Sequence, residues 1–315
     1  ITMRRNGSLI TTEVELKKQQ RQDSQTYELP DGRQLGYSQY GDLNGHPLFF
    51  FHGLPSSRLE CAEFDPTANK LNIHLIGIDR PGLGLSTFQQ NRRITDWPND
   101  VRRLADHLGL DTFRVIGSSG GGPYALACAH GLPRNRLIGV GILAGAAPWQ
   151  AGTKGMTLVG RVIWNIWAWA PWTCRAMCES LVKAAKDPHP EKMGELYDSA
   201  LSTIKESDRK LLKDETIRRC TVAMLRAAFV QGSDGAVLET KLLTRPWDFK
   251  IEDIQYEGIK MWYGDEDTNT PLSGARYMAE RLPRSKLKVY PGETHYMTAS
   301  SARAEEILKE MMFND

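Results

Sequence analysis

Two glycines flank a serine at residues 117–121, where the letters Gly-Ser-Ser-Gly-Gly follow the β-branched pair Val115-Ile116. The spacing matches the pattern G-x-S-x-G with Ser119 at its centre, which is typical of a strand that turns sharply into a helix. Side chains at the flanking positions would collide with the neighbouring backbone, so glycine is needed there. The segment lacks the lysine of a phosphate-binding loop and the spacing of a dinucleotide-binding loop. Ser119 is therefore predicted to be the nucleophile, and Ser118 is expected to point elsewhere.

A serine hydroxyl is a weak nucleophile and needs a base that is oriented by an acid. With this kind of turn, the partners follow along the chain in the order serine, acid, histidine. Of the seven histidines, His295 is the one that follows both Ser119 and a strand near the end of the chain, and we predict that it is the base. The acid is expected in the segment Gly-Asp-Glu-Asp that begins at residue 264. We favour Asp267, with Asp265 second and Glu266 third; a solvated acidic turn is the alternative for all three.

Acyl transfer also needs donors for a developing oxyanion, and backbone N–H groups are the usual source. The residue after the nucleophile, Gly120, supplies one donor. The second is expected in the segment His-Gly-Leu-Pro at residues 52–55, where proline has no N–H but Leu54 does. His52 lies beside these donors, and we interpret it as a residue that binds loop backbone.

The elements that position these residues alternate between strand and helix. Residues 25–42 predict a hairpin around Pro30-Asp31-Gly32, and further strands are expected from their β-branched and aromatic runs at 47–53, 73–82, 113–121, 137–145, 259–267 and 286–295. Helical spacing between them indicates right-handed crossovers and a mostly parallel sheet with helices on both faces. The alternation stops near Ala147, and the pattern is helical until about Leu243. The sequence thus predicts an N-terminal extension at 1–24, an α/β core at 25–148 and 245–315, and an inserted helical segment at 149–244.

The start of this insert is rich in tryptophan and contains five of the eight tryptophans of the chain, at 149, 164, 167, 169 and 172. Three interpretations stay open: packing of a buried helix, the lining of an aromatic pocket by Trp164, Trp167 and Trp169, or an interfacial anchor. Arg161, Asn165 and Pro171 interrupt a run that is already too short for a membrane span.

Composition narrows the class of partner. The net charge is +2 and lysine and arginine are spread throughout, which argues against nucleic acid and favours a small molecule. The five cysteines lack zinc-type spacing and indicate reduced thiols and a cytoplasmic location, and Cys174 and Cys178 are interpreted as buried apolar groups. Residues 1–24 lack the apolar stretch of a secretory signal and are expected to form a surface extension. Neither a metal nor an organic cofactor is predicted, and the sequence leaves the oligomeric state open.

Taken in order, the segments FHGLPSSR, GIDRPGLGLS, GSSGGGPYALACA, RPWDF, WYGDEDTNTP and PGETH resemble those of α/β-hydrolases, and more narrowly of members with a serine nucleophile and a cap. The resemblance covers the chain from about Gln25 to its end. It implies an α/β-hydrolase fold, in which a mostly parallel central sheet is flanked by helices and carries an inserted helical cap. It also implies the triad Ser119, Asp267 and His295 with donors at Leu54 and Gly120. Epoxide hydrolases and haloalkane dehalogenases share the loop at 52–55 but have an aspartate in place of the serine.

The expected activity is hydrolysis of an ester-type carbonyl, in an ester, lactone or thioester of a small apolar or aromatic molecule, through an acyl-enzyme. Two alternatives remain. The same triad can serve acyl transfer, lactone formation or C–C bond cleavage, and some members of this fold are small-molecule receptors. Receptors tend to lose a member of the triad, whereas this chain retains all three.

Overall fold

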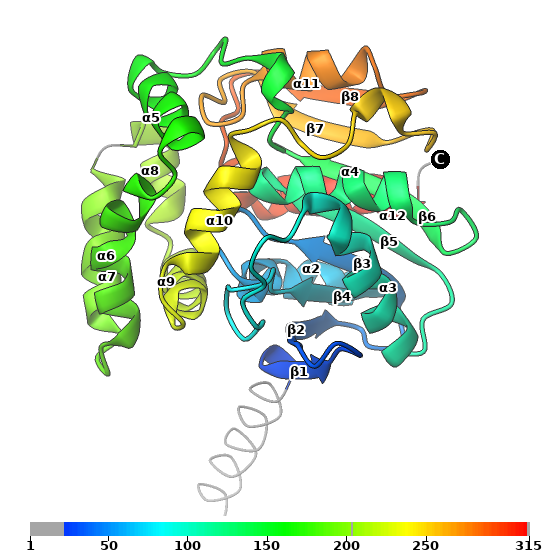
Figure 1. The fold of residues 1–315 in the computed structure, drawn as a ribbon, viewed down its shortest axis with the longest axis horizontal. Helices are drawn as coiled ribbons and strands as arrows, with labels where there is room; N and C mark the ends of the chain where they lie inside the picture. Colours follow the sequence, from blue (N-terminus) through cyan, green and yellow to red (C-terminus); the bar gives the residue numbers. More distant parts are fainter. Residues whose placement is uncertain (1–21, 203, 314–315) are drawn as a thin grey trace, which may run out of the picture.

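The computed structural model describes residues 22–202 and 204–313, which form a central sheet with helices on both faces (Figure 1). The order of strands across the sheet is β1-β2-β4-β3-β5-β6-β7-β8. Strand β2 is antiparallel to both of its neighbours, and the remaining pairs are parallel. The strands are β1 (Gln25–Glu28), β2 (Gln34–Gly41), β3 (His46–Phe51), β4 (Ile73–Ile78), β5 (Phe113–Ser118), β6 (Leu137–Leu143), β7 (Lys260–Gly264) and β8 (Lys286–Tyr290). The predicted hairpin and the mostly parallel sheet are both confirmed.

Strand β3 shows why the sheet is buried on both faces. Its alternate side chains Phe49 and Phe51 join a core cluster with α3 (Trp97–His107), α4 (Gly122–Gly131) and α11 (Leu272–Ala279). Leu48 and Phe50 point the other way, into a cluster with α2 (Asp65–Lys70) and α12 (Ser301–Phe313). Because successive side chains of a strand face opposite sides, an apolar run without alternation requires helices on both. This packing fixes the strand ends, from which the loops of the site project.

Between β6 and β7 the described residues form six α-helices, which lie together on one side of the molecule in Figure 1. They are α5 (Leu158–Trp169), α6 (Thr173–Lys186), α7 (Glu191–Leu201), α8 (Glu206–Leu212), α9 (Glu215–Phe229) and α10 (Asp234–Leu243). All six fall inside the predicted range 149–244; we call them the helical insert. Cys174 and Cys178 are buried in an apolar cluster made mostly of insert residues, as interpreted from the sequence. Their sulfur atoms are 3.6 Å apart.

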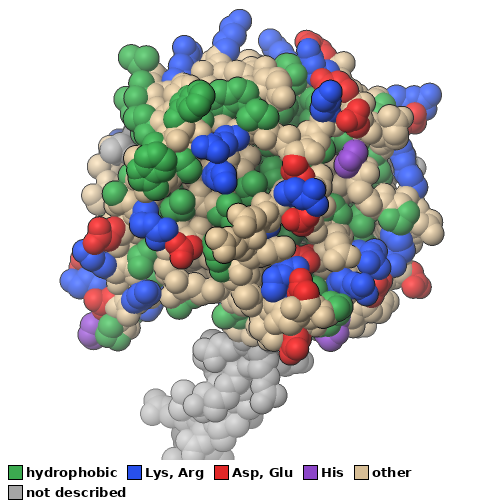
Figure 2. Space-filling model, viewed as in Figure 1, with side chains coloured by type: hydrophobic (Ala, Val, Ile, Leu, Met, Phe, Trp, Pro, Cys, Tyr) green, Lys and Arg blue, Asp and Glu red, His purple; other side chains and the backbone are tan. Residues whose placement is uncertain are grey.

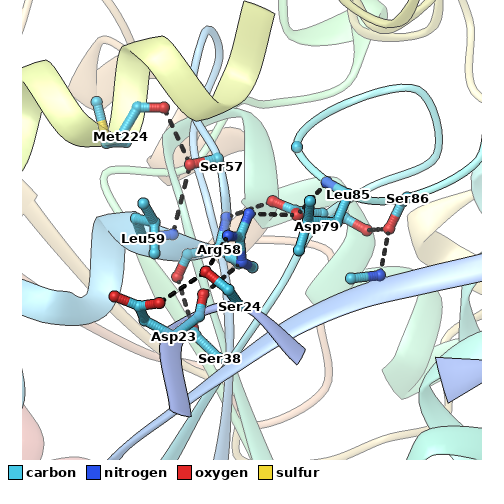
Figure 3. Close-up of polar contacts among 12 residues, drawn as sticks. Asp23, Ser24, Ser38, Ser57, Arg58, Leu59, Asp79, Leu85, Ser86 and Met224 are labelled. Carbon is cyan, nitrogen blue, oxygen red and sulfur yellow. Dashed lines mark hydrogen bonds and ion pairs between the residues drawn. The ribbon is translucent and has the colours of Figure 1, made fainter. Parts of the chain in front are cut away.

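The predicted N-terminal extension falls mostly outside the described residues. Its last part is described: the backbone oxygen of Asp23 accepts a hydrogen bond of 2.6 Å from Arg58 Nε, and Ser24 Oγ accepts one of 3.1 Å from Arg58 Nη2 (Figure 3). The start of the described chain is thereby joined to the core. Across the described residues, no helix is both long and apolar enough to cross a membrane.

Candidate active site

Ser119 lies at the sharp turn between β5 and α4, with a φ of +49° that non-glycine residues rarely adopt. The flanking glycines are required by contact. A Cβ on Gly117 would lie 2.3 Å from the oxygen of Gly121, and a Cβ on Gly121 would lie 2.1 Å from the oxygen of Phe51. Both distances are far below van der Waals contact, so no other residue fits at either position. The turn holds the Ser119 hydroxyl at the wall of a cavity.

Three residues predicted from the sequence meet in one chain of hydrogen bonds. His295 Nε2 is 3.1 Å from Ser119 Oγ, and His295 Nδ1 is 2.7 Å from Asp267 Oδ2. An ionised carboxylate can only accept, so Nδ1 carries the proton and Nε2 faces the serine hydroxyl as an acceptor. Residues that follow three different strands, β5, β7 and β8, are thus brought within hydrogen-bonding distance of one another.

The carboxylate of Asp267 is fully buried and surrounded by donors. Its Oδ1 accepts from the backbone N–H groups of Asn269 and Thr270, each at 2.8 Å, and its Oδ2 accepts from Thr270 Oγ1 at 2.8 Å. Burial by itself raises the pKa of Asp267, but the charge of His295 and these hydrogen bonds outweigh it and hold the pKa below its usual value. For His295, burial lowers the pKa, but the charge of Asp267 and its hydrogen bond outweigh burial and raise the pKa above 6.5.

The other two carboxylates of this segment have different partners. Asp265 Oδ1 accepts the N–H of Gly292 at 2.7 Å, which joins the two turns that follow β7 and β8. Glu266 is paired with Lys205 at the surface. Neither contacts His295, so the geometry favours Asp267 among the three candidates.

The two predicted oxyanion donors lie against each other beside the serine. A Cβ on Gly120 would be 3.3 Å from the backbone nitrogen of Leu54, and a Cβ on Gly53 would be 3.6 Å from Ser119 Oγ. The loop that carries Leu54 therefore lies against the turn that carries Gly120. Glycine at 53 leaves this approach open.

Sequence reasoning missed the group that holds this loop in place. Arg80, fully buried, donates to the backbone oxygens of His52 and Gly53, the latter at 2.8 Å. His52 Nε2 in turn accepts the N–H of Arg80 at 3.2 Å, and burial lowers the pKa of His52 well below 6.5, so its ring is neutral. This agrees with the interpretation of His52 as a loop-binding residue. The segment Gly-Ile-Asp-Arg-Pro-Gly that carries Arg80 is the signal that could have found this role.

Arg80 is compensated by a carboxylate from the helical insert. Its Nε is 2.9 Å from Glu239 Oε2, and both side chains are completely buried. Arg92 also pairs with Glu239, and the hydroxyl of Tyr124 donates to it at 2.8 Å. The partner lies 159 positions away in the chain, on α10, and no local pattern announces it.

A second ion pair fixes the helix that follows the loop, a 3-10 helix η1 (Arg58–Phe64). Asp79 Oδ1 accepts the N–H of Arg58 at 2.6 Å, and its Oδ2 is 3.0 Å from Arg58 Nη1 (Figure 3). Ser57 Oγ donates to the backbone oxygen of Met224 on α9 at 3.0 Å, which ties η1 to the insert (Figure 3). This helix carries two glutamates, Glu60 and Glu63, that line the cavity.

The cavity has a volume of about 660 Å³ and is lined by Ser119, His295, Leu54 and Gly120 on one side. On the other side Trp164 and Trp167 of α5 line it, together with residues of α7 and α9. This volume lies within the range of small-molecule sites. Among the described residues, no group of three or more histidine, cysteine, aspartate or glutamate side chains is arranged to hold a metal ion.

Trp169 does not line this cavity, and that part of the sequence prediction is wrong. Residues 164 and 167 are three apart and share one face of α5, whereas 169 lies two residues beyond 167 and projects from the other side. Trp169 is 79% exposed, and the same helix carries the exposed apolar residues Leu158, Val159, Val162 and Ile166. Figure 2 shows hydrophobic side chains gathered over the part of the surface where Figure 1 places α5.

Comparison with known proteins identifies the fold that carries this site. Residues 46–149 match the family model described as alpha/beta hydrolase fold. A hydrolase from Pseudomonas aeruginosa PA01 superposes with a TM-score of 0.69 at 15% identity, over 93% of this chain and 99% of that one. The chain has the α/β-hydrolase fold. Two further structures with this fold are an esterase from Rhodococcus sp. ECU1013 (TM-score 0.64, 16% identity, 93% and 100% covered) and a bromoperoxidase from Bacillus anthracis (0.63, 17%, 92% and 99%).

Two curated proteins with partial similarity are named proline iminopeptidases. The one from Leptolyngbya boryana, named as probable, is 34% identical over 110 residues, which is 33% of each chain. The one from Arabidopsis thaliana is 31% identical over 112 residues, 33% of this chain and 28% of that one. The matched stretch thus spans about a third of the length of these relatives.

Proposed function

We propose that this protein is a serine hydrolase that cleaves an ester-type carbonyl of a small, largely apolar molecule through an acyl-enzyme. The observation that carries the proposal is the unbroken chain of hydrogen bonds from Asp267 through His295 to Ser119 Oγ, which lies at the wall of a cavity. The hydrolases and esterases among the structures of the same fold support it.

In the proposed mechanism, His295 Nε2 takes the proton of Ser119 as Oγ attacks the carbonyl carbon. Asp267 keeps the ring in the tautomer that presents Nε2 and stabilises the imidazolium that forms. The N–H groups of Leu54 and Gly120 stabilise the oxyanion. His295 then gives its proton to the leaving oxygen. A water molecule, deprotonated by His295, then attacks the carbonyl of the acyl-enzyme. The bond to Ser119 Oγ breaks as His295 returns the proton to that oxygen, and the acid is released.

The helical insert serves as the cap in this proposal, with the core at residues 25–148 and 245–315. Its residues supply most of the apolar wall, including Trp164, Trp167, Met224 and Leu225. A substrate enclosed in this way is shielded from bulk water, which strengthens each electrostatic contact that the core makes with it.

A fluorophosphonate probe tests the proposal. The native chain is expected to be labelled at Ser119 and to hydrolyse p-nitrophenyl esters, since an activated serine reacts with both. Ser119→Ala and His295→Ala are expected to abolish labelling, whereas Ser118→Ala, the matched control, is expected to retain it. A folded chain that resists the probe at neutral pH would overturn the hydrolase and favour a receptor.

The fate of the acyl group separates the remaining alternatives. Labelling without hydrolysis of any ester would favour acyl transfer, lactone formation or C–C bond cleavage at the same triad. The substrate panel includes L-proline 4-nitroanilide, because the two partial relatives are named proline iminopeptidases. Faster cleavage of this anilide than of the esters would replace the ester by an amide in the proposal.

A further inference from the structure

The charged groups that line the cavity are of one sign. Glu60 and Glu63 contribute carboxylates, and no lysine or arginine occurs among the described residues that line it. The other titratable groups in the lining are His295 and Tyr296 from the segment after β8, Cys220 from α9, and Tyr197 from α7. The remainder is apolar or uncharged, so two carboxyl groups face a cavity whose described lining supplies no lysine or arginine against them.

Glu60 is held close to the nucleophile. Its Oε2 accepts the N–H of Gly53 at 2.7 Å. A Cβ on Gly53 would lie 3.5 Å from that oxygen and 3.2 Å from the Cβ of Ser119, so the carboxylate and the serine flank the same residue. A negative charge at this distance opposes the oxyanion that the proposed reaction forms, because like charges repel strongly in a water-poor cavity. A positive charge brought by the substrate would offset that repulsion.

Glu63 follows three positions later on η1, so both carboxylates project from the same side of this helix. Within the described part of the chain its carboxylate makes no hydrogen bond and no ion pair, although η1 itself is fixed by the Arg58–Asp79 pair and by Ser57 (Figure 3). Burial, and next the charge of Glu60, raise the pKa of Glu63 to about 8. A rigidly mounted carboxyl group that faces a cavity without a partner is suited to bind a group that enters from outside.

We propose that Glu63, together with Glu60, forms a subsite for a positively charged ammonium group of the substrate; this rests on the proposed function, in which the cavity binds the substrate. The aromatic side chains Trp164, Trp167, Tyr197 and Tyr296 line the same cavity. Ring faces attract cations, and the apolar wall suits the carbon groups around an organic ammonium better than it suits a hydrated metal ion. The substrate class is therefore an acyl compound that carries an amine or a quaternary ammonium.

A pair of esters of equal shape tests this subsite. Butyrylcholine carries a quaternary nitrogen, and 3,3-dimethylbutyl butyrate has a carbon atom in its place. The native chain is expected to have a kcat/KM for butyrylcholine at least about tenfold higher, as an ion pair combined with a cation–π contact in a cavity provides. Glu63→Gln is expected to lower that ratio about tenfold, since it keeps the shape and cannot ionise when a cation binds. Glu280→Gln, at an exposed position on the molecular surface, is the matched control and leaves the ratio unchanged.

Equal kcat/KM values for the two esters in the native chain would overturn the subsite. The same holds for a preference that survives in Glu63→Gln. Both outcomes are read as ratios, so a general loss of activity in a variant does not hide them.

Binding to the Ser119→Ala variant separates failure of the subsite from failure of the proposed hydrolysis. Titration calorimetry at pH 7 is expected to show tighter binding of butyrylcholine than of its neutral isostere, with release of a proton, because a cation lowers the pKa of Glu63 from about 8. His295, Glu60, Cys220, Tyr197 and Tyr296 also face the cavity, so the proton is assigned to Glu63 only if Ser119→Ala combined with Glu63→Gln loses it. Equal binding of both esters contradicts the subsite. If Ser119→Ala binds butyrylcholine selectively but the native chain hydrolyses neither ester, the proposed hydrolysis is contradicted and the subsite is supported.

Discussion

The two walls of the cavity are built by different forces. On the core side, hydrogen bonds and ion pairs fix the loops that carry Ser119, Leu54 and His295, and buried charges such as Asp267 have two or more partners. On the insert side, the lining is mainly apolar, and Trp164 and Trp167 reach the cavity from a helix whose opposite face is exposed. Directional contacts restrict geometry to fractions of an ångström, whereas apolar contacts tolerate exchange of side chains. In the proposed reaction, the core wall carries the chemistry and, on η1, the ammonium subsite, whereas the apolar insert wall sets which acyl groups fit.

One buried ion-pair group crosses from one wall to the other. Glu239 of the insert compensates Arg80 and Arg92 of the core, and Arg80 holds the backbone oxygens of His52 and Gly53. The position of the insert is thereby linked to the loop that carries Leu54. We call Glu239 with Arg80 and Arg92 the crossing point. If the two walls have separate functions, a change at the crossing point should alter both stability and catalysis, whereas a change on one wall should alter only the property that this wall controls.

The largest effect is expected on the core wall, from Asp267→Asn. The amide turns an N–H toward His295 Nδ1, so the ring adopts the wrong tautomer and no longer takes the proton of Ser119. We expect kcat for ester hydrolysis to fall by about four orders of magnitude. Asp265→Asn, two positions away, removes only an acceptor for the N–H of Gly292 and is expected to have a mild effect. Steady-state kinetics of the two variants decide, and the reverse result would move the acid to Asp265.

The next effect is expected at the crossing point, from Glu239→Gln. The amide is isosteric but leaves two buried guanidinium groups without a counter-charge, which costs about 3–5 kcal/mol in the free energy of unfolding. Urea denaturation measures this loss, and kcat is expected to fall with it because the loop of His52 and Gly53 loses its anchor. Asp198→Asn is the control: it breaks an exposed pair with Arg218 and is expected to leave the denaturation midpoint nearly unchanged. Similar midpoints for the two variants would show that the crossing pair does not stabilise the fold.

The core wall could be predicted from the sequence because its residues lie in short local patterns. Glycines at 117 and 121 are forced by backbone contacts below 2.5 Å, so the turn leaves a mark in the letters themselves. Asp267 and His295 follow strands whose parallel order brings their ends to one edge of the sheet. Local pattern plus topology was enough to select these residues.

The insert wall and the crossing pair could not be predicted in this way. Glu239 meets Arg80 only because α10 packs beside the core, and helical periodicity does not state which neighbour a helix chooses. The tryptophans of α5 are the same type of residue in one short segment, yet Trp167 lines the cavity and Trp169 is exposed. Glu63 gives no signal in the sequence, because a glutamate on a short helix is usually solvated.

A moderate effect is expected on the insert wall, from Trp164→Ala. Removing the ring enlarges the cavity, so kcat/KM should shift toward longer acyl chains by about tenfold while the response to the probe at Ser119 is retained. Trp169→Ala, on the exposed side of the same helix, is the matched control and should change neither preference nor labelling. Rates with p-nitrophenyl acetate and p-nitrophenyl octanoate measure the shift. An equal shift in both variants would mean that α5 acts through its fold and not through the cavity.

The smallest effect is expected from Glu60→Gln, in the pH dependence of the reaction. Glu60 lines the cavity, and its charge also contributes to the pKa of His295. His295 must be neutral to take a proton, so kcat/KM should rise with pH through the pKa of His295. Burial lowers this pKa, but the charge of Asp267 and, to a smaller extent, that of Glu60 raise it above 6.5. The midpoint of the pH profile should therefore lie above 6.5. Glu60→Gln removes one of the two negative charges. The amide oxygen can still accept the N–H of Gly53, so the loop is retained and the midpoint should move to lower pH by a fraction of a unit. The pH profile is measured with the neutral ester p-nitrophenyl butyrate, to keep substrate charge out of the comparison. Glu280→Gln should leave the midpoint in place, and a shift to higher pH in Glu60→Gln would show that Glu60 acts on His295 through structure and not through charge.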